Sequence, residues 1–166
     1  MDGRPVLALI ARTLEKCGLE AVLIGNAAAA LQGAPVTTID FDFMFRKTPA
    51  NLRKLKAFAA ALDAMILRPY YPASDLFRIV REDDGLQIDF MASVHGVRSL
   101  ASLKSRARTV RFEDAKLLVS DLADVVKSKR AAGRARDLAV LPVIEKTLHE
   151  ETRKKKREAR RTEERE

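Results

Sequence analysis

The sequence predicts a mixed α/β (α+β) fold, in which helices pack on a mixed sheet and the C-terminal part is helical. Helical and strand-like hydrophobic patterns are interspersed along the chain, and strand-like runs occur both in hairpins and after helices. Of the 166 residues, 47% are hydrophobic, which is enough for one core. No internal repeat of fixed period is present, so the chain is not expected to be a solenoid.

The N-terminal half is predicted to alternate between helices and strands. Apolar side chains at helical spacing follow Pro5 and stop at Gly18, which favours a helix over 5–17. The apolar run at 19–24 is bounded by glycines and is typical of a buried strand. The elements expected next are a short helix at 26–31 with Asn26 as N-cap, a strand at 37–45, and a helix from 49 to about 64 with Thr48 as N-cap.

The C-terminal half is predicted to begin with a hairpin. Asp83-Asp84-Gly85 is a typical turn between the strand-like runs 76–81 and 86–91, whereas 65–75 is expected to be irregular because it contains two prolines. The elements expected after the hairpin are a short helix at 97–105, strands at 108–112 and 116–119, a helix capped by Ser120 that runs to Ala132, and a last helix at about 134–149.

The chain is expected to divide into a folded domain at 1–149 and a charged tail at 150–166. The tail reads EETRKKKREARRTEERE and has no apolar side chain larger than that of Ala159. Such a segment cannot bury itself, so it should be disordered or form an exposed helix. It is either a solvated terminus or an arm that binds a phosphate backbone.

Composition excludes several classes of function. The single Cys17 rules out an internal disulfide or a cysteine-cluster zinc site, and two histidines are too few for a histidine-rich metal site. No apolar run is long enough to cross a bilayer and the first residues do not form a signal peptide, so we expect a cytoplasmic protein with no membrane partner. The formal net charge of +8 suggests a polyanionic partner such as nucleic acid or a nucleotide.

Two carboxylates stand two residues apart in the strand-like segment 37–45. Asp40 and Asp42 should therefore project to one face, and Ile39, Phe41 and Phe43 to the opposite, buried face. Adjacent carboxylates repel each other unless a cation neutralises them, and Mg²⁺ prefers carboxylate oxygens together with substrate phosphates. The alternative is an exposed strand edge that happens to carry two acids.

A third carboxylate, Asp89, lies in the apolar run 86–91. If that strand lies beside 37–45, Asp89 joins the pair, and three acids can hold one or two Mg²⁺ or Mn²⁺ ions for phosphoryl or nucleotidyl transfer. Upstream, a predicted strand leads through Gly25-Asn26 into a helix, a geometry that directs backbone N–H groups towards a position where a triphosphate could bind.

The order of these motifs resembles the nucleotidyltransferase fold of DNA polymerase beta and its minimal relatives. Those proteins have a Gly-Ser or Gly-Gly turn before an Asp-x-Asp strand, as in Gly25-Asn26, then Asp40-x-Asp42, then the strand residue Asp89. The segment 120–138, SDLADVVKSKRAAGRARDL, is similar to the Asp-Leu, Lys and Arg-x-x-Asp-Leu pattern of AbiEii-type nucleotidyltransferases. These include toxins of toxin–antitoxin and phage-defence systems. The resemblance covers about 5–148.

The resemblance implies a role for each matching residue. Asp40 and Asp42 would be metal ligands, and Asp89 would be a third ligand or the base for the acceptor hydroxyl. The remaining contacts it implies are Gly25 and Asn26 with the triphosphate, Lys129 with a phosphate or the nucleotide, and Asp137 in the same cleft. The alternatives from the residues alone are a solvated Lys129 and a simple ion pair between Arg134 and Asp137.

These residues predict a metal-dependent nucleotidyltransferase that moves NMP from a nucleoside triphosphate to an acceptor hydroxyl. The toxin resemblance implies an RNA acceptor, a tRNA end, and a cognate antitoxin as partner. One alternative is a small-molecule enzyme that adenylylates an antibiotic. The other is an inactive binding module, because Asn26 replaces the usual Ser or Gly and Val36 replaces an Arg that is frequent in related sequences.

Overall fold

The computed structural model describes residues 3–67 and 75–165, within which seven strands form one mixed sheet. Residues 68–74 of the stretch predicted to be irregular lie outside the described residues, and the prediction was wrong for Met65–Leu67, which form β3 because they pair with β4. The sheet order is β3-β4-β5-β2-β1-β7-β6. The strands are β1 (Ala21–Ile24), β2 (Phe41–Phe45), β3 (Met65–Leu67), β4 (Leu76–Arg81), β5 (Leu86–Met91), β6 (Arg108–Phe112) and β7 (Ala115–Val119).

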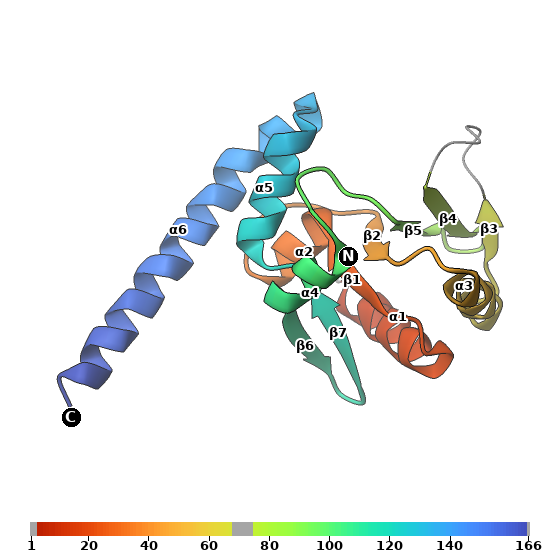
Figure 1. The fold of residues 1–166 in the computed structure, drawn as a ribbon, viewed down its shortest axis with the longest axis horizontal. Helices are drawn as coiled ribbons and strands as arrows, with labels where there is room; N and C mark the ends of the chain where they lie inside the picture. The colour runs from red at the N-terminus through yellow and green to blue at the C-terminus, as the bar shows by residue number, and fades with distance from the viewer. Residues whose placement is uncertain (1–2, 68–74, 166) are drawn as a thin grey trace.

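Six helices flank this sheet in the described part of the chain (Figure 1). They are α1 (Arg4–Cys17), α2 (Gly25–Leu31), α3 (Pro49–Ala61), α4 (Leu100–Arg106), α5 (Leu122–Ala132) and α6 (Ala135–Glu163). The predicted mixed sheet with flanking helices is therefore confirmed. None of the helices in the described ranges is both long and apolar enough to cross a membrane.

Alternate residues of the central strands contribute to two different cores. Leu23 of β1 and Phe43 of β2 belong to the main core, together with side chains of α1 and α3. Val22 and Met44 instead join a smaller cluster with Leu103 of α4. Because side chains alternate along a strand, Asp42 faces the α4 side of the sheet, away from the main core.

Four phenylalanines hold the centre of the main core together. Phe90 of β5 stacks on Phe43 at a ring-centroid distance of 5.3 Å and meets Phe45 and Phe58 edge-on at 5.7 and 5.3 Å. All four side chains are fully buried. Since offset-stacked and edge-on rings are the favoured aromatic geometries, this cluster fixes β5 against β2 and both strands against α3.

Several predicted elements are confirmed in detail. The hairpin strands coincide with β4 and β5, and Thr48 caps α3 by accepting a hydrogen bond from the backbone N–H of Asn51 at 3.1 Å. The predicted strand at 108–112 coincides with β6. These elements depend on local turn and cap chemistry, which the sequence displays directly.

Three other local predictions were wrong. The strand predicted at 37–45 begins only at Phe41, and Ile39, expected to be buried, is 83% exposed because no neighbouring strand pairs with its segment. Asn26 is not an N-cap, since α2 already begins at Gly25. The cap of α5 is Asp121 rather than Ser120, and its carboxylate accepts from the N–H of Ala123 at 3.4 Å.

The last helix is much longer than predicted. α6 continues without a break through the predicted tail to Glu163 and contains Pro142. Its first turns pack beside α5 and Glu151 pairs with Arg108 of β6, whereas the turns after Glu151 stand clear of the sheet and of the other helices (Figure 1). The domain boundary at residue 149 stays a prediction, and it falls within a continuous helix.

We predict that Phe90→Ala lowers the free energy of unfolding by about 3–5 kcal/mol, because it removes the ring that contacts three others and leaves a cavity. Phe90→Leu, which keeps most of the volume, should cost less than about 2 kcal/mol. Urea unfolding followed by circular dichroism measures both. Equal losses for the two variants would contradict the central role of the ring.

Candidate functional site

Asp42 and Asp89 lie side by side on neighbouring strands. β2 and β5 pair in parallel, and the register aligns Asp42 with Asp89. The expectation that the Asp89 strand lies beside the Asp42 strand is therefore confirmed. Both carboxylates lie on the face opposite the phenylalanine core, because Phe43 and Phe90, the next residue on each strand, point into that core.

Gly25 brings the polypeptide backbone close to Asp42. β1 ends at Ile24, which is aligned with Asp42 in the antiparallel pair β1–β2. Gly25 has a φ of +68°, and a Cβ atom placed on it would lie 3.2 Å from Oδ2 of Asp42. A left-handed backbone and close approach both favour glycine here, so this position lets the start of α2 border the carboxylate.

The environment of Asp42 disfavours its negative charge. Burial, the charge of Asp89 and the charge of Asp40 raise the pKa of Asp42 to about 6, while Lys129 and Arg136 partly oppose that rise. Among the described residues, no side chain or backbone N–H donates a hydrogen bond to the carboxylate of Asp40 or Asp42, and neither forms an ion pair within 4.0 Å. A bound cation would relieve this repulsion.

Asp89, in contrast, is already paired. Arg78 of β4 is aligned with Asp89 and donates two hydrogen bonds to it, from Nε at 2.9 Å and from a terminal guanidinium nitrogen at 3.0 Å. This is the bidentate geometry in which a guanidinium matches a carboxylate best. The Asp89 side chain is 8% exposed, so Arg78 neutralises a buried charge.

Lys129 and Asp137 form a second charged group next to the first. Nζ of Lys129 lies 3.5 Å from Oδ1 of Asp137, and Nε of Arg134 lies 2.6 Å from Oδ2. Lys129 is only 11% exposed, so it is not a solvated lysine, and the pairing of Arg134 with Asp137 is confirmed. Lys129 is also close enough to Asp42 for the two charges to influence each other's pKa.

Burial and charge act in opposite directions on this pair. Burial lowers the pKa of Lys129, against the attraction of Asp137. Burial alone would raise the pKa of Asp137, but the hydrogen bond and charge of Arg134, with the charge of Lys129, hold it below its usual value. Asp137 therefore stays ionised and fixes Lys129 at the end of α5.

Asn26 links α2 to the segment that precedes β2. Its Nδ2 donates to the carbonyl oxygen of Thr37 at 3.3 Å, whereas its buried Oδ1 has no hydrogen-bond partner within the described part of the chain. The side chain thus holds the Asp40 segment near Gly25. The predicted contacts of Gly25 and Asn26 with a triphosphate stay predictions.

A divalent cation at this site would be held by two carboxylates rather than three. No group of three His, Cys, Asp or Glu side chains within 3–67 and 75–165 is placed to hold a metal ion, and Arg78 occupies both oxygens of Asp89. Asp40 and Asp42 are free of such partners. Mg²⁺ is commonly held by one or two carboxylates plus substrate phosphates and water, so these two would suffice.

Arg78 and Arg136 are absent from the residues that the sequence singled out. The correctly predicted hairpin pairs Arg81 with Leu86, and counting along the two strands places Arg78 opposite Asp89. The position of Arg78 opposite Asp89 could therefore have been predicted from the register of the hairpin. Arg136 lies within the segment that is similar to the AbiEii-type pattern, but the sequence analysis gave it no role. Its effect on the pKa of Asp42 depends on how α6 packs.

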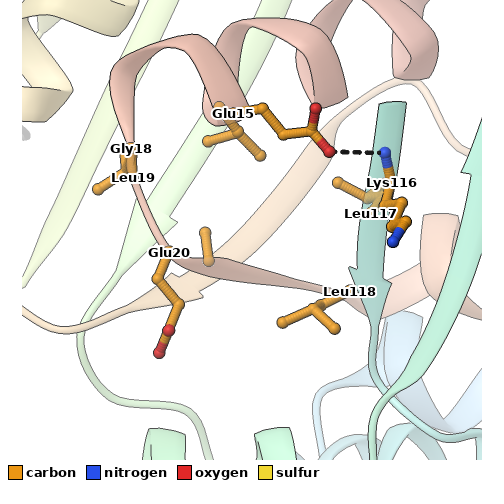
Figure 2. Close-up of a pocket in the computed structure, with 9 residues that line it drawn as sticks. Glu15, Gly18, Leu19, Glu20, Lys116, Leu117 and Leu118 are labelled. Atoms are coloured by element: carbon orange, nitrogen blue, oxygen red, sulfur yellow. Dashed lines mark hydrogen bonds between the residues drawn. The ribbon is translucent and has the colours of Figure 1, made fainter. Parts of the chain in front are cut away.

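A pocket of about 260 Å³ lies at the other end of β1 (Figure 2). It is bordered by the end of α1, the start of β1 and part of β7, and the carboxylate of Glu15 accepts a hydrogen bond there from the N–H of Lys116 at 2.9 Å. Gly25 follows the opposite end of β1, so this hollow is separate from the carboxylate site.

Solved structures share this architecture, although no family model and no curated protein matches the sequence. A proposed nucleotidyltransferase from Thermotoga maritima (TM1012) superposes with a TM-score of 0.61 at 18% identity, over 88% of this chain and 92% of that one. ANT(2″)-Ia, solved in complex with adenylyl-2″-tobramycin, superposes with a TM-score of 0.61 at 12% identity, over 96% and 97% of the two chains.

A third similar structure is an antigenic nucleotidyltransferase-like protein from Paracoccidioides brasiliensis, with a TM-score of 0.53 at 14% identity over 85% of this chain and 74% of that one. At such low identities the likeness shows a shared fold and nothing finer. The chain thus has the nucleotidyltransferase fold.

We predict that Asp42→Asn raises the free energy of unfolding by about 2 kcal/mol at pH 8 in the presence of EDTA. The native state holds the pKa of Asp42 near 6, above the ordinary value of 3.8, so ionised Asp42 destabilises the fold above pH 6. Below about pH 3 the carboxyl is mostly protonated in both states and the gain should vanish. Urea unfolding at several pH values measures it.

Asp63→Asn is the matched control for this experiment, because Asp63 is exposed and has a φ of 52°, which asparagine also tolerates. It should change stability by less than about 0.5 kcal/mol at either pH. A gain from Asp42→Asn that is the same at pH 4 and pH 8 would contradict electrostatic repulsion as its cause.

We predict that Gly25→Ala is more destabilising than Gly18→Ala. Both glycines have a φ near +65°, so alanine costs about 1–2 kcal/mol of backbone energy at either position. A Cβ at residue 18 would meet nothing within 4 Å, whereas one at residue 25 would press on Asp42. We expect an extra loss of about 1 kcal/mol from that contact, measured by thermal unfolding. Equal losses would mean that Asp42 moves away freely.

Proposed function

We propose that the protein is a metal-dependent nucleotidyltransferase that moves NMP from a nucleoside triphosphate to a hydroxyl of an RNA acceptor, such as a tRNA end. The observation that carries the proposal is the alignment of Asp42 with Asp89, next to Gly25 and Lys129, within a nucleotidyltransferase fold. A parallel register that places two acids together, bordered by a glycine and a buried lysine, suits the binding of a nucleotide with its cation.

Each side chain has a distinct proposed role. Asp40 and Asp42 would hold Mg²⁺ or Mn²⁺, which when bound would stabilise the charge that develops on the reacting phosphate. Lys129, oriented by Asp137, would contact a phosphate of the nucleotide. Gly25 and Asn26 would border the triphosphate. Asp89 would lie beside the acceptor hydroxyl, where Arg78 holds its carboxylate in a fixed orientation.

An RNA acceptor is supported by charge, since the chain carries a formal net charge of +8. The resemblance to AbiEii-type proteins adds the further proposals of a toxin or phage-defence role, a cognate antitoxin and a cytoplasmic location. These rest on the sequence alone.

A second candidate function is adenylyl transfer to a small antibiotic. The likeness to ANT(2″)-Ia favours it, because the superposition covers nearly the whole of both chains. Both candidates use the same carboxylates and the same attack of a hydroxyl on the α-phosphorus with release of pyrophosphate. They differ only in the molecule that carries the acceptor hydroxyl, so one assay with two sets of acceptors separates them.

We predict that the full chain transfers label from an α-³²P-labelled NTP to total tRNA in the presence of Mg²⁺ or Mn²⁺, and that Asp42→Asn abolishes the transfer. Asp63→Asn should retain it. The four NTPs are tested in turn, with tobramycin and related aminoglycosides as parallel acceptors. Label in the aminoglycoside alone would select the second candidate.

Two results would reject nucleotidyl transfer altogether. One is equal label transfer by wild type and Asp42→Asn. The other is the absence of transfer to every acceptor combined with no NTP binding by calorimetry in the presence of Mn²⁺. The second result would support the inactive binding module instead.

A further inference from the structure

Six basic side chains form a continuous stripe on the C-terminal half of α6. At about 100° of rotation per residue they fall within about 160° of the helix circumference. All are exposed. This basic stripe consists of Arg153, Lys154, Lys156, Arg157, Arg160 and Arg161.

The basic stripe lacks internal charge compensation. In the part of the chain that the structure describes, none of the six side chains forms an ion pair within 4.0 Å. Lys155, which lies on the other side of the helix, pairs with Glu151 at 3.7 Å. Glu158 is the acidic residue within 152–162 and also falls outside the stripe. Over 152–162 the stripe therefore carries basic side chains alone, and acidic residues border it at Glu150 and Glu164.

This arrangement is unfavourable for an isolated helix. Arg153 and Arg157, Lys156 and Arg160, and Arg157 and Arg161 are all four residues apart, a spacing at which like charges repel. A polyanion that binds along the stripe would remove the repulsion of every pair at once. The stripe thus presents positive charge that suits a negatively charged partner.

The base of the helix is fixed, so the stripe has a defined position. Arg108 at the start of β6 pairs with Asp121 at 2.9 Å and also with Glu151, just before the stripe begins. Arg130 of α5 pairs with Glu145 one and a half turns earlier. Beyond these anchors the helix stands clear of the domain (Figure 1).

The stripe is separate from the carboxylate site. At about 1.5 Å per residue, Arg153 lies about 24 Å and Arg161 about 36 Å along the helix from Asp137. Asp137 also faces inward to α5, whereas the stripe lies on the opposite side of the helix. A nucleotide bound at Asp42 cannot reach it, so the stripe needs a ligand of its own.

We propose that the C-terminal half of α6 binds the phosphodiester backbone of a nucleic acid. Six cations spaced over about 12 Å match a polymer with closely spaced phosphates, whereas a single phosphate would meet only one or two of them. A membrane surface fits less well, because 152–163 contains no apolar side chain larger than Ala159 that could enter a bilayer interface. The proposal holds whether or not the protein is a nucleotidyltransferase.

The test measures binding by fluorescence anisotropy with the full chain, without nucleotide and in EDTA, so that catalysis plays no part. The probes are a fluorescein-labelled RNA hairpin and a DNA hairpin of the same sequence, at 50–200 mM NaCl. The variant Lys154→Gln/Lys156→Gln/Arg157→Gln removes three stripe charges with a good helix former. The control Arg53→Gln/Lys54→Gln/Lys56→Gln removes the same residue types from the exposed side of α3.

We expect the stripe variant to bind at least about tenfold more weakly at 100 mM NaCl and to reduce the slope of log K against log salt by about 2–3. The α3 control should change affinity less than about twofold. Stripe-dependent binding of either hairpin supports the proposal, and the pair shows whether RNA or DNA is preferred.

Equal losses for the two triple variants would overturn the proposal, as would the absence of wild-type binding at 50 mM NaCl. Anionic vesicles of phosphatidylserine and phosphatidylcholine form a third arm. Stripe-dependent vesicle binding without hairpin binding would likewise overturn it. Circular dichroism confirms that each variant keeps the helical content of the wild type.

Discussion

The parallel pairing of β2 with β5 determines where every charge of the candidate site lies. The stacked rings of Phe43 and Phe90 lock the two strands in one register. A shift of β5 by a single residue would turn Phe90 to the wrong face of the sheet and would carry Asp89 into the main core. Packing on the apolar face of the sheet therefore fixes the positions of the side chains on the polar face. Aromatic packing supplies the free energy that offsets the repulsion between the two carboxylates.

The repulsion between Asp42 and Asp89 is offset differently at the two carboxylates. Asp89 has a permanent counter-charge in Arg78, whereas Asp42 has only distant help from Lys129 and Arg136 and keeps a pKa near 6. Asp42 is buried, repelled by its neighbours and without a hydrogen-bonded partner in the described residues, which suits it to the cation of the proposed function. Asp89, which Arg78 already neutralises, is better suited to orienting the acceptor than to coordinating a metal ion. This difference between the two carboxylates follows from Arg78 on β4.

The sequence predicted the fold and the main carboxylates because both depend on local patterns. Alternation of apolar residues placed Asp42 and Asp89 on one side of their strands, and the hairpin turn fixed the partner of each residue in β4. Ile39 was misplaced because strand ends depend on whether a neighbour pairs with them, which no single segment reveals. The burial of Lys129 escaped prediction for a similar reason: it depends on how α6 packs against α5.

The length of α6 bears on the size of the molecule that the protein binds. The likeness to ANT(2″)-Ia extends over nearly the whole chain but shows the fold alone, so it does not distinguish the two proposed classes of acceptor. A small acceptor held beside Asp89 would leave the basic stripe without a partner, since the stripe begins about 24 Å along α6 from Asp137 of the charged site. A nucleic acid could contact both. Arg136, exposed in the first turn of α6 and close enough to lower the pKa of Asp42, adds a positive charge at the carboxylate site. The charge distribution therefore favours a polymeric partner more strongly than the fold does.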